Sequence, residues 1–194
     1  MAEARLPILH GNFRIIAFRG KGKLDAKDHV VLVRGRVAGA SGVPVRIHSE
    51  CLTGDVFGSL RCDCHAQLQA ALCKIGKMPR GLVIYLRQEG RGIGLANKIR
   101  AYALQEKGMD TVEANIALGF PSDMRDYGVA AAVLSHLKVK SIALITNNPD
   151  KIEKLSACGV KVARRIPHEF GLTARNRAYL RTKRDKMAHM LSKV

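Results

Sequence analysis

The sequence of 194 residues contains no tryptophan and only nine other aromatic residues, five Phe and four Tyr. So few aromatics form no clear stacking array for nucleic acid, and the sequence has no zinc-finger spacing. No apolar run approaches the roughly 20 residues of a membrane-spanning helix. The segment from Met1 to Pro7 lacks the apolar core of a signal peptide, so we expect a cytoplasmic protein with reduced cysteines.

Acidic residues are also scarce, because 16 Asp and Glu stand against 33 Lys and Arg and give a formal net charge of +17. Residues 161–194 alone carry ten basic side chains and two acidic ones. Such a charge attracts polyanions, which include nucleic acid, an anionic membrane and a phosphorylated substrate. A zinc-stabilised nucleic-acid-binding protein is therefore the alternative to an enzyme, although the shortage of aromatics argues against it.

Strand-like and helix-like segments alternate along the chain after residue 43. Runs of β-branched and aromatic residues predict strands, and apolar residues at helical spacing predict helices. Pro149 is expected to open one helix and Gly159 to close it. The predicted strands are residues 13–18, 29–37, 43–48, 81–86, 141–145 and 160–166, and the predicted helices are residues 66–75, 94–107, 125–137, 149–158 and 175–191.

This alternation is typical of an α/β architecture, which we expect to be a layered α/β/α fold. The first strands have no helices between them, and a Gly- and Lys-rich turn is predicted from Arg19 to Asp28. We therefore predict a mixed sheet rather than a purely parallel one. Residues 1–172 are expected to form one catalytic domain, and residues 173–194 a basic helical tail that either packs on it or stays mobile.

Three of the five cysteines, Cys51, Cys62 and Cys64, lie within 14 residues of one another. Three thiolates at this spacing can converge on one zinc ion if the intervening segment forms a loop. Such a site would leave a fourth position for water, whose pKa zinc lowers to about 7. The spacing is equally compatible with a closed structural site, in which His48, His65 or Cys73 supplies the fourth ligand. Unliganded, buried cysteines are the remaining interpretation.

The residues around these cysteines make the pattern specific. The run from His48 to Asp55, His-Ser-Glu-Cys-Leu-Thr-Gly-Asp, and the following Arg-Cys-Asp-Cys at residues 61–64 resemble the zinc motif of GTP cyclohydrolase II. Further blocks match in order, so the resemblance covers nearly the whole chain. They are Arg87 to Leu95, Asn97 to Gln105, Asp110 to Asn115, Leu118 to Phe120, Leu144 to Pro149 and Tyr179 to Leu191.

The resemblance implies hydrolysis of GTP in two places, with loss of diphosphate and expulsion of C8 of the purine as formate. The product would be 2,5-diamino-6-(5-phosphoribosylamino)pyrimidin-4-one, in the first step of riboflavin synthesis. The resemblance also implies one Zn²⁺ per chain, Mg²⁺ with the substrate phosphates, and a homodimer. The dihydroxybutanone phosphate synthase domain that is often fused to this family has no room here, so a single-function enzyme is implied.

The resemblance further assigns roles to individual residues. Cys51, Cys62 and Cys64 would hold the metal, Asp123 would accept a proton, and Tyr102 would help to complete ring opening. Arg125 is proposed as a nucleophile in the family, but a guanidinium stays protonated, so we assign Arg125 to stabilising phosphate charge. The residues implied to contact the nucleotide are Arg46, Ile47, His48, Ser49, Glu50, Gln67, Glu89, Gly90, Arg91, Thr111, Thr146 and Lys151.

Local sequence adds three expectations to this picture. Ser122 is a plausible N-cap for a helix that would contain Asp123 and Arg125. Thr146 lies between a strand and a helix, where free N–H groups can bind an anion. Two residues depart from the family pattern, since Asp150 replaces the common Lys and His65 replaces the usual Gly after the last zinc cysteine.

Overall fold

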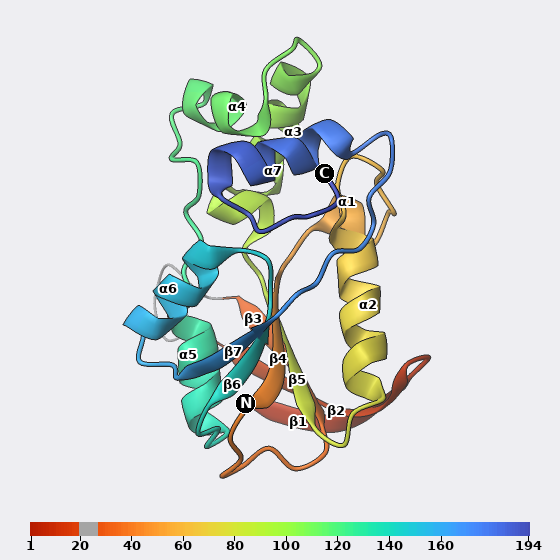
Figure 1. Ribbon diagram of the computed structural model, residues 1–194, viewed down its shortest axis with the longest axis vertical. Helices are drawn as coiled ribbons and strands as arrows, with labels where there is room; N and C mark the ends of the chain where they lie inside the picture. The colour runs from red at the N-terminus through yellow and green to blue at the C-terminus, as the bar shows by residue number, and fades with distance from the viewer. Residues whose placement is uncertain (20–26) are drawn as a thin grey trace.

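The computed structural model describes residues 1–19 and 27–194, so most of the turn predicted between Arg19 and Asp28 lies outside the described residues. Its centre is a seven-stranded sheet in the order β1-β2-β3-β5-β4-β6-β7 (Figure 1). The strands are β1 (Ala2–Ile8), β2 (Gly11–Arg19), β3 (Asp28–Arg34), β4 (Val43–Ser49), β5 (Gly81–Leu86), β6 (Ile142–Ile145) and β7 (Val162–Ile166).

The sheet has an antiparallel half and a parallel half, which meet at β5. In the order β1, β2, β3, β5, each strand pairs antiparallel with the next. In the order β5, β4, β6, β7, each strand pairs parallel with the next. The prediction of a mixed sheet is therefore confirmed. The parallel half contains the crossover connections, and its neighbouring strands β5, β4 and β6 end at the same edge of the sheet.

Helices cover both faces of the sheet, which confirms the layered α/β/α prediction (Figure 1). On one face, α2 (Cys64–Gly76) places Leu72 and Ile75 against Val83 of β5. On the other face lie α5 (Gly128–His136) and α6 (Pro149–Ala157). There Leu82 and Ile84 of β5 point into the larger core, since successive strand residues face opposite sides of a sheet.

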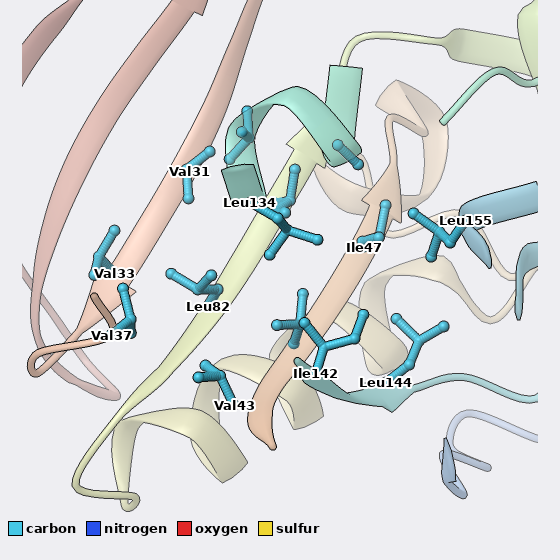
Figure 2. Packing of buried hydrophobic residues seen from close by; sticks show 14 of the residues in the cluster. Val31, Val33, Val37, Val43, Ile47, Leu82, Leu134, Ile142, Leu144 and Leu155 are labelled. Carbon is cyan, nitrogen blue, oxygen red and sulfur yellow. The ribbon is translucent and has the colours of Figure 1, made fainter. Parts of the chain in front are cut away.

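The larger core is built from aliphatic side chains that solvent does not reach. Figure 2 shows Val31 and Val33 of β3, Ile47 of β4 and Leu144 of β6 together with Leu134 of α5 and Leu155 of α6. Burying such side chains stabilises the fold by roughly 25 cal/mol for each Å² of apolar surface that is removed from water. This core holds β5, β4 and β6 together, and the carboxyl ends of these three strands lie at one edge of the sheet.

The remaining helices lie beyond that edge, at the carboxyl ends of the parallel strands (Figure 1). They include α4, which the sequence patterns did not predict and which begins with a capping box between Asp110 and Glu113. The set comprises α1 (Leu52–Asp55), the 3₁₀ turn η1 (Glu89–Gly92), α3 (Gly94–Gln105), α4 (Thr111–Ala117) and α7 (Arg177–Met187). Among the described residues, no helix is long and apolar enough to cross a membrane.

Several predicted boundaries are wrong, and one error affects functional residues. The helix predicted from residue 125 begins at Gly128, with Tyr127 at the N-cap position, so Ser122 does not cap it. Asp123 instead accepts hydrogen bonds from the backbone and side chain of Arg125, which holds this segment in a local turn. The strand predicted to residue 37 ends at Arg34, because Gly35 turns the chain with a φ of +62°.

We expect Leu82→Ala to lower the free energy of unfolding by about 2–5 kcal/mol, because it leaves a cavity in the larger core where Leu82 is fully buried. Leu9→Ala is the matched control, since Leu9 is 96% exposed and its truncation should change stability by less than about 0.5 kcal/mol. Urea denaturation measures both. Equal effects of the two substitutions would contradict the assignment of this core.

Candidate functional site

A cleft lies at the carboxyl ends of β5, β4 and β6. Residues that follow directly on these strands line it: Glu50 and Cys51 after β4, Glu89 after β5, and Thr146 and Asn147 after β6. Helices α2, α3, α4, α6 and α7 contribute further lining residues. In open α/β sheets, ligands bind outside the carboxyl ends of the parallel strands, so the cleft stands where a substrate site is expected.

Three thiol groups converge at one end of this cleft. Cys51 precedes α1, Cys62 lies in the following loop, and Cys64 is the first residue of α2. Their sulfur atoms all lie within 4.8 Å of one another, and Cys51 Sγ lies 3.8 Å from Cys62 Sγ. Within the part of the chain that the structure describes, this tight group contains neither His48 nor His65 nor Cys73. The donor set is therefore three sulfurs.

Gly54 makes this convergence possible. It is buried within α1, and a Cβ atom at this position would lie 2.9 Å from Cys62 Sγ and 3.1 Å from Cys51 Sγ. Contacts below 3.0 Å essentially never occur for real Cβ atoms, so any larger residue would displace the sulfurs. Because Gly54 has no side chain, the loop from Cys51 to Cys64 can close with its sulfurs packed against the backbone of α1.

Lys98 of α3 supplies a positive charge to the thiol group. Its Nζ donates hydrogen bonds to Cys51 Sγ at 3.1 Å, to Thr53 Oγ1 at 2.9 Å and to Glu89 Oε1 at 2.7 Å. Burial alone would lower the pKa of Lys98, but the hydrogen bond to Glu89 and the charge of Cys51 raise it above its usual value. Lys98 therefore stays protonated and ties the 3₁₀ turn to the cysteine loop.

The three thiols differ in acidity because they share hydrogen bonds. Hydrogen bonds from the Cys62 and Cys64 thiols lower the pKa of Cys51, which Lys98 also stabilises as a thiolate. The same hydrogen bond to Cys51 raises the pKa of Cys62 to about 11. Among the three thiols, Cys51 is therefore the one most readily held as a thiolate.

A second group of side chains fixes the start of the cysteine loop. The carboxylate of Asp55 accepts hydrogen bonds from His48 Nε2 at 3.0 Å, Tyr85 Oη at 2.9 Å and the Cys51 backbone N–H at 3.1 Å. Burial lowers the pKa of His48, so its ring is neutral near pH 7. Because Nε2 faces the carboxylate, the Nδ1 atom of His48 is the acceptor.

A buried polar chain connects β4 with the loop between Cys62 and Cys64. Arg46 donates to Gln67 Oε1 at 2.5 Å, and Gln67 Nε2 donates to Asp63 Oδ2 at 2.5 Å. The other oxygen of Asp63 accepts from Lys183 Nζ at 2.7 Å. Residues far apart in the sequence therefore hold Asp63, which lies between two of the cysteines.

The other end of the cleft is basic and has little to neutralise it. Lys151 of α6 is buried, and its Nζ donates to the Ile47 carbonyl at 2.8 Å. Burial, together with the charges of Arg46 and Arg125, lowers the pKa of Lys151 well below its usual value. An anion bound here would reverse that shift, since a nearby negative charge favours protonated lysine.

Asp123 and Arg125 form a bidentate ion pair beside this basic end. Arg125 Nε lies 2.9 Å from Asp123 Oδ1, and Arg125 NH2 lies 2.5 Å from Asp123 Oδ2. Despite burial, this partner raises the pKa of Arg125 and keeps the guanidinium charged. Arg125 lines the cleft, whereas Asp123 is not among the residues that line it.

Unpaired buried polar atoms also concentrate in the cleft. Among the described residues, six such side-chain atoms have no hydrogen-bond partner. Four of them belong to residues that line the cleft: Arg46 Nε, His48 Nδ1, Asn148 Oδ1 and His189 Nε2. Because an unpaired buried polar group costs about 1–3 kcal/mol, these four atoms make the lining of the cleft costly to bury.

Comparison with known proteins agrees with this geometry. The sequence model of GTP cyclohydrolase II matches residues 1–167. The chain belongs to the GTP cyclohydrolase II family. The resemblance seen in the motifs is thereby confirmed, and family membership makes the protein a hydrolase of the GTP cyclohydrolase II class.

Individual members of the family are closely similar. The chain is 53% identical over 193 residues to a GTP cyclohydrolase-2 from Aeromonas hydrophila, covering 100% of this chain and 97% of that protein. It is also 53% identical over 189 residues to a GTP cyclohydrolase-2 from Picrophilus torridus, covering 97% of each. A riboflavin biosynthesis protein RibBA from Endomicrobium trichonymphae is 54% identical over 190 residues, which are 97% of this chain and 46% of that protein. The chain thus spans about half the length of its RibBA relatives.

The structure brings most of the residues predicted from the family motifs into one cleft. Two do not line it: the side chain of Ile47 is fully buried in the larger core, and Asp123 pairs with Arg125, which does line the cleft. Those that line it are Arg46, His48, Ser49, Glu50, Cys51, Cys62, Cys64, Gln67, Glu89, Gly90, Arg91, Tyr102, Thr111, Arg125, Thr146 and Lys151.

Sequence reasoning missed Lys98, Tyr179, Lys183 and His189, all of which line the same cleft. Lys98 lies in one of the blocks that resemble the family, but a lysine on a helix is ordinarily solvent-exposed. A possible signal was its place one turn before Tyr102, since residues four apart share a helix face. Tyr179, Lys183 and His189 lie in the basic C-terminal segment, where no local pattern distinguished them from other residues.

We expect Lys98→Met to weaken zinc affinity by about 10- to 100-fold, because the thiolate of Cys51 loses its buried donor. Competition with a chromophoric chelator measures this affinity. Arg100→Met is the matched control, since Arg100 is an exposed residue of the same helix and bonds only to Asn97 among the described contacts. If both variants bound zinc as the unchanged protein does, Lys98 would have no part in the metal site.

Proposed function

We propose that this protein hydrolyses GTP, opens the imidazole ring of guanine and releases formate and diphosphate. The product is 2,5-diamino-6-(5-phosphoribosylamino)pyrimidin-4-one, which begins riboflavin synthesis. The observation that carries the proposal is that three convergent cysteines and a buried basic region border one cleft. Family membership supports the same reaction.

Cys51, Cys62 and Cys64 would hold one Zn²⁺ per chain. Three convergent sulfurs packed against Gly54 fit a soft tetrahedral metal, and the part of the chain that the structure describes adds no fourth ligand to the group. Zinc bound there would supply hydroxide at neutral pH for attack on C8, a poor electrophile. Lys98 and Asp55 orient the cysteine loop through Cys51.

The guanine edge of GTP carries N–H donors that a carboxylate can accept. Glu89 already accepts from Leu52 N–H, Gly90 N–H and Lys98, so its oxygens serve the loop itself. Glu50 lines the same cleft and pairs with the half-exposed Arg87. We therefore assign recognition of the guanine N1–H and N2–H₂ groups to Glu50.

The phosphates would occupy the basic end of the cleft. Thr146 and Lys151 lie at the start of α6, where unpaired N–H groups and the helix dipole favour an anion. Arg125 stays protonated beside Asp123, so it stabilises phosphate charge rather than attacking phosphorus. The proton-acceptor role implied for Asp123 requires this pair to open, because Arg125 lowers the pKa of Asp123.

Tyr102 stands between the cysteines and the rest of the cleft. Its Oη lies 3.3 Å from Thr53 Oγ1, and the guanidinium of Arg61 covers its ring at 4.9 Å. Burial raises the pKa of Tyr102, so the phenol keeps its proton and can donate it during ring opening. Mg²⁺ with the substrate phosphates, a homodimer and a cytoplasmic location complete the proposal on family resemblance.

Incubation of the zinc-loaded protein with GTP and Mg²⁺ is expected to yield formate and diphosphate in equal amounts. Mass analysis of the products distinguishes complete ring opening from arrest at a formamide. A nucleic-acid-binding protein would instead leave GTP unchanged and retain nucleic acid on a filter at about 150 mM salt. Unchanged GTP with both metals present would refute the proposed reaction.

Cys62→Ser is expected to lose both zinc and ring opening, because two sulfurs remain where the ion needs three. Cys158→Ser is the matched control, since Cys158 is exposed at the end of α6, far in sequence from the triad. Metal content and formate release are measured on both. Ring opening by a zinc-free Cys62→Ser protein would rule out the mechanism.

A further inference from the structure

The C-terminal segment, residues 173–194, contributes part of the lining of the cleft. In Figure 1, α7 runs above the carboxyl ends of the strands, between α4 and the top of α2. Tyr179, Lys183, Met187 and His189 of this segment all line the cleft. The segment begins beyond residue 167, where the match to the family model ends.

Three contacts attach this segment to the two sides of the cleft. Lys183 Nζ pairs with Asp63 Oδ1 at 2.7 Å, and Asn176 Nδ2 donates to the Cys62 carbonyl at 3.3 Å. On the opposite side, the Met190 N–H donates to the Asn147 carbonyl at 2.8 Å, beside Thr146. The segment therefore bridges the cysteine loop and the loop after β6.

The ion pair between Lys183 and Asp63 is the buried member of these contacts. The Lys183 side chain is 12% exposed and that of Asp63 is 3% exposed. Asp63 also accepts a hydrogen bond from Gln67, and Gln67 accepts one from Arg46 of β4. Removing one partner of an ion pair at this depth is strongly destabilising, because the other charge stays buried without a partner.

We propose that Lys183 is a positioning residue for the metal loop, and that residues 173–194 form a wall of the nucleotide site. Lys183 holds Asp63, and Asp63 holds the backbone between two metal ligands, so docking of the segment sets where Cys62 and Cys64 stand. His189 of the same segment also lines the cleft, and its buried Nε2 has no hydrogen-bond partner among the described residues. The nucleotide half of this inference rests on the proposed function, whereas the metal half rests on geometry alone.

Lys186 provides an internal comparison on the same helix. Its side chain is 45% exposed and pairs with Asp110 and with Glu113, at 3.0 Å from the latter. These partners belong to α4 and its cap, away from the cysteines. Replacing Lys186 therefore removes a basic residue of α7 and an ion pair without touching the metal loop.

The first test measures zinc affinity by chelator competition in Lys183→Met and Lys186→Met. We expect zinc affinity to fall by about 10- to 100-fold in Lys183→Met and to stay unchanged in Lys186→Met. The double variant Asp63→Asn, Lys183→Met removes both charges of the ion pair, so neither is left buried without the other, and it should retain the weakened affinity. Zinc affinity equal to that of the unchanged protein in this double variant would overturn the inference.

The second test needs no substitution and follows hydrogen exchange in the unchanged protein with and without zinc. If the segment positions the metal ligands, zinc must in turn favour its docking by the same factor. Amides of residues 177–187 should therefore exchange about 10- to 100-fold faster after zinc is removed, while those of β1 keep their rates. Equal exchange of residues 177–187 in both states would refute the coupling.

Neither test uses GTP turnover, so each gives its answer even if the proposed reaction fails. The claim that residues 173–194 form a wall of the nucleotide site is tested separately, by measuring the KM for GTP in the double variant loaded fully with zinc. We expect KM to rise about tenfold or more, since the wall that carries Tyr179 and His189 no longer docks. An unchanged KM alongside weakened zinc affinity would remove the nucleotide half and leave the metal half standing.

Discussion

The crowding of three thiols within 4.8 Å is the constraint on which the site depends. Three thiolates so close repel one another strongly, so without a cation only Cys51 is favoured as a thiolate. The fold accommodates this crowding by placing Gly54 inside the loop and Lys98 against Cys51. A divalent cation among the sulfurs relieves the same repulsion, which is why the arrangement suits a metal.

The rest of the site follows from how the parallel strands end. Strands β5, β4 and β6 are parallel neighbours, so the residues that follow each strand lie close together at one edge of the sheet. This places the cysteine loop, Glu89 and Thr146 around the same space. The buried basic residues Arg46 and Lys151 then stand near one another, and burial together with the charge of Arg46 lowers the pKa of Lys151.

Residue patterns predicted the features that depend on local physics. The apolar run at β5, the helical spacing of α2 and the Pro149 start of α6 all reflect short-range preferences, and they predicted these elements correctly. The thiol spacing indicated a metal site, and the family motifs indicated most of the cleft. Strand β1 was missed because its side chains are mostly exposed, so its sequence lacks a buried-strand pattern.

Features that arise from contacts distant in sequence were not predictable in this way. Lys98 and Lys183 look like ordinary basic residues on helices, and only the folded chain shows that each meets the cysteine loop. The same holds for Ser122, whose predicted capping role is displaced by the pair between Asp123 and Arg125. Side-chain chemistry is readable from sequence, but the partner of a charge depends on topology.

X-ray absorption at the zinc edge tests most directly whether the three cysteines form an open metal site. In the zinc-loaded protein, we predict three sulfur ligands at about 2.3 Å and one oxygen ligand from solvent. Four sulfurs, or three sulfurs with the multiple-scattering pattern of an imidazole, would show a closed structural site. Either of those results would contradict the account of a metal that faces the nucleotide cleft.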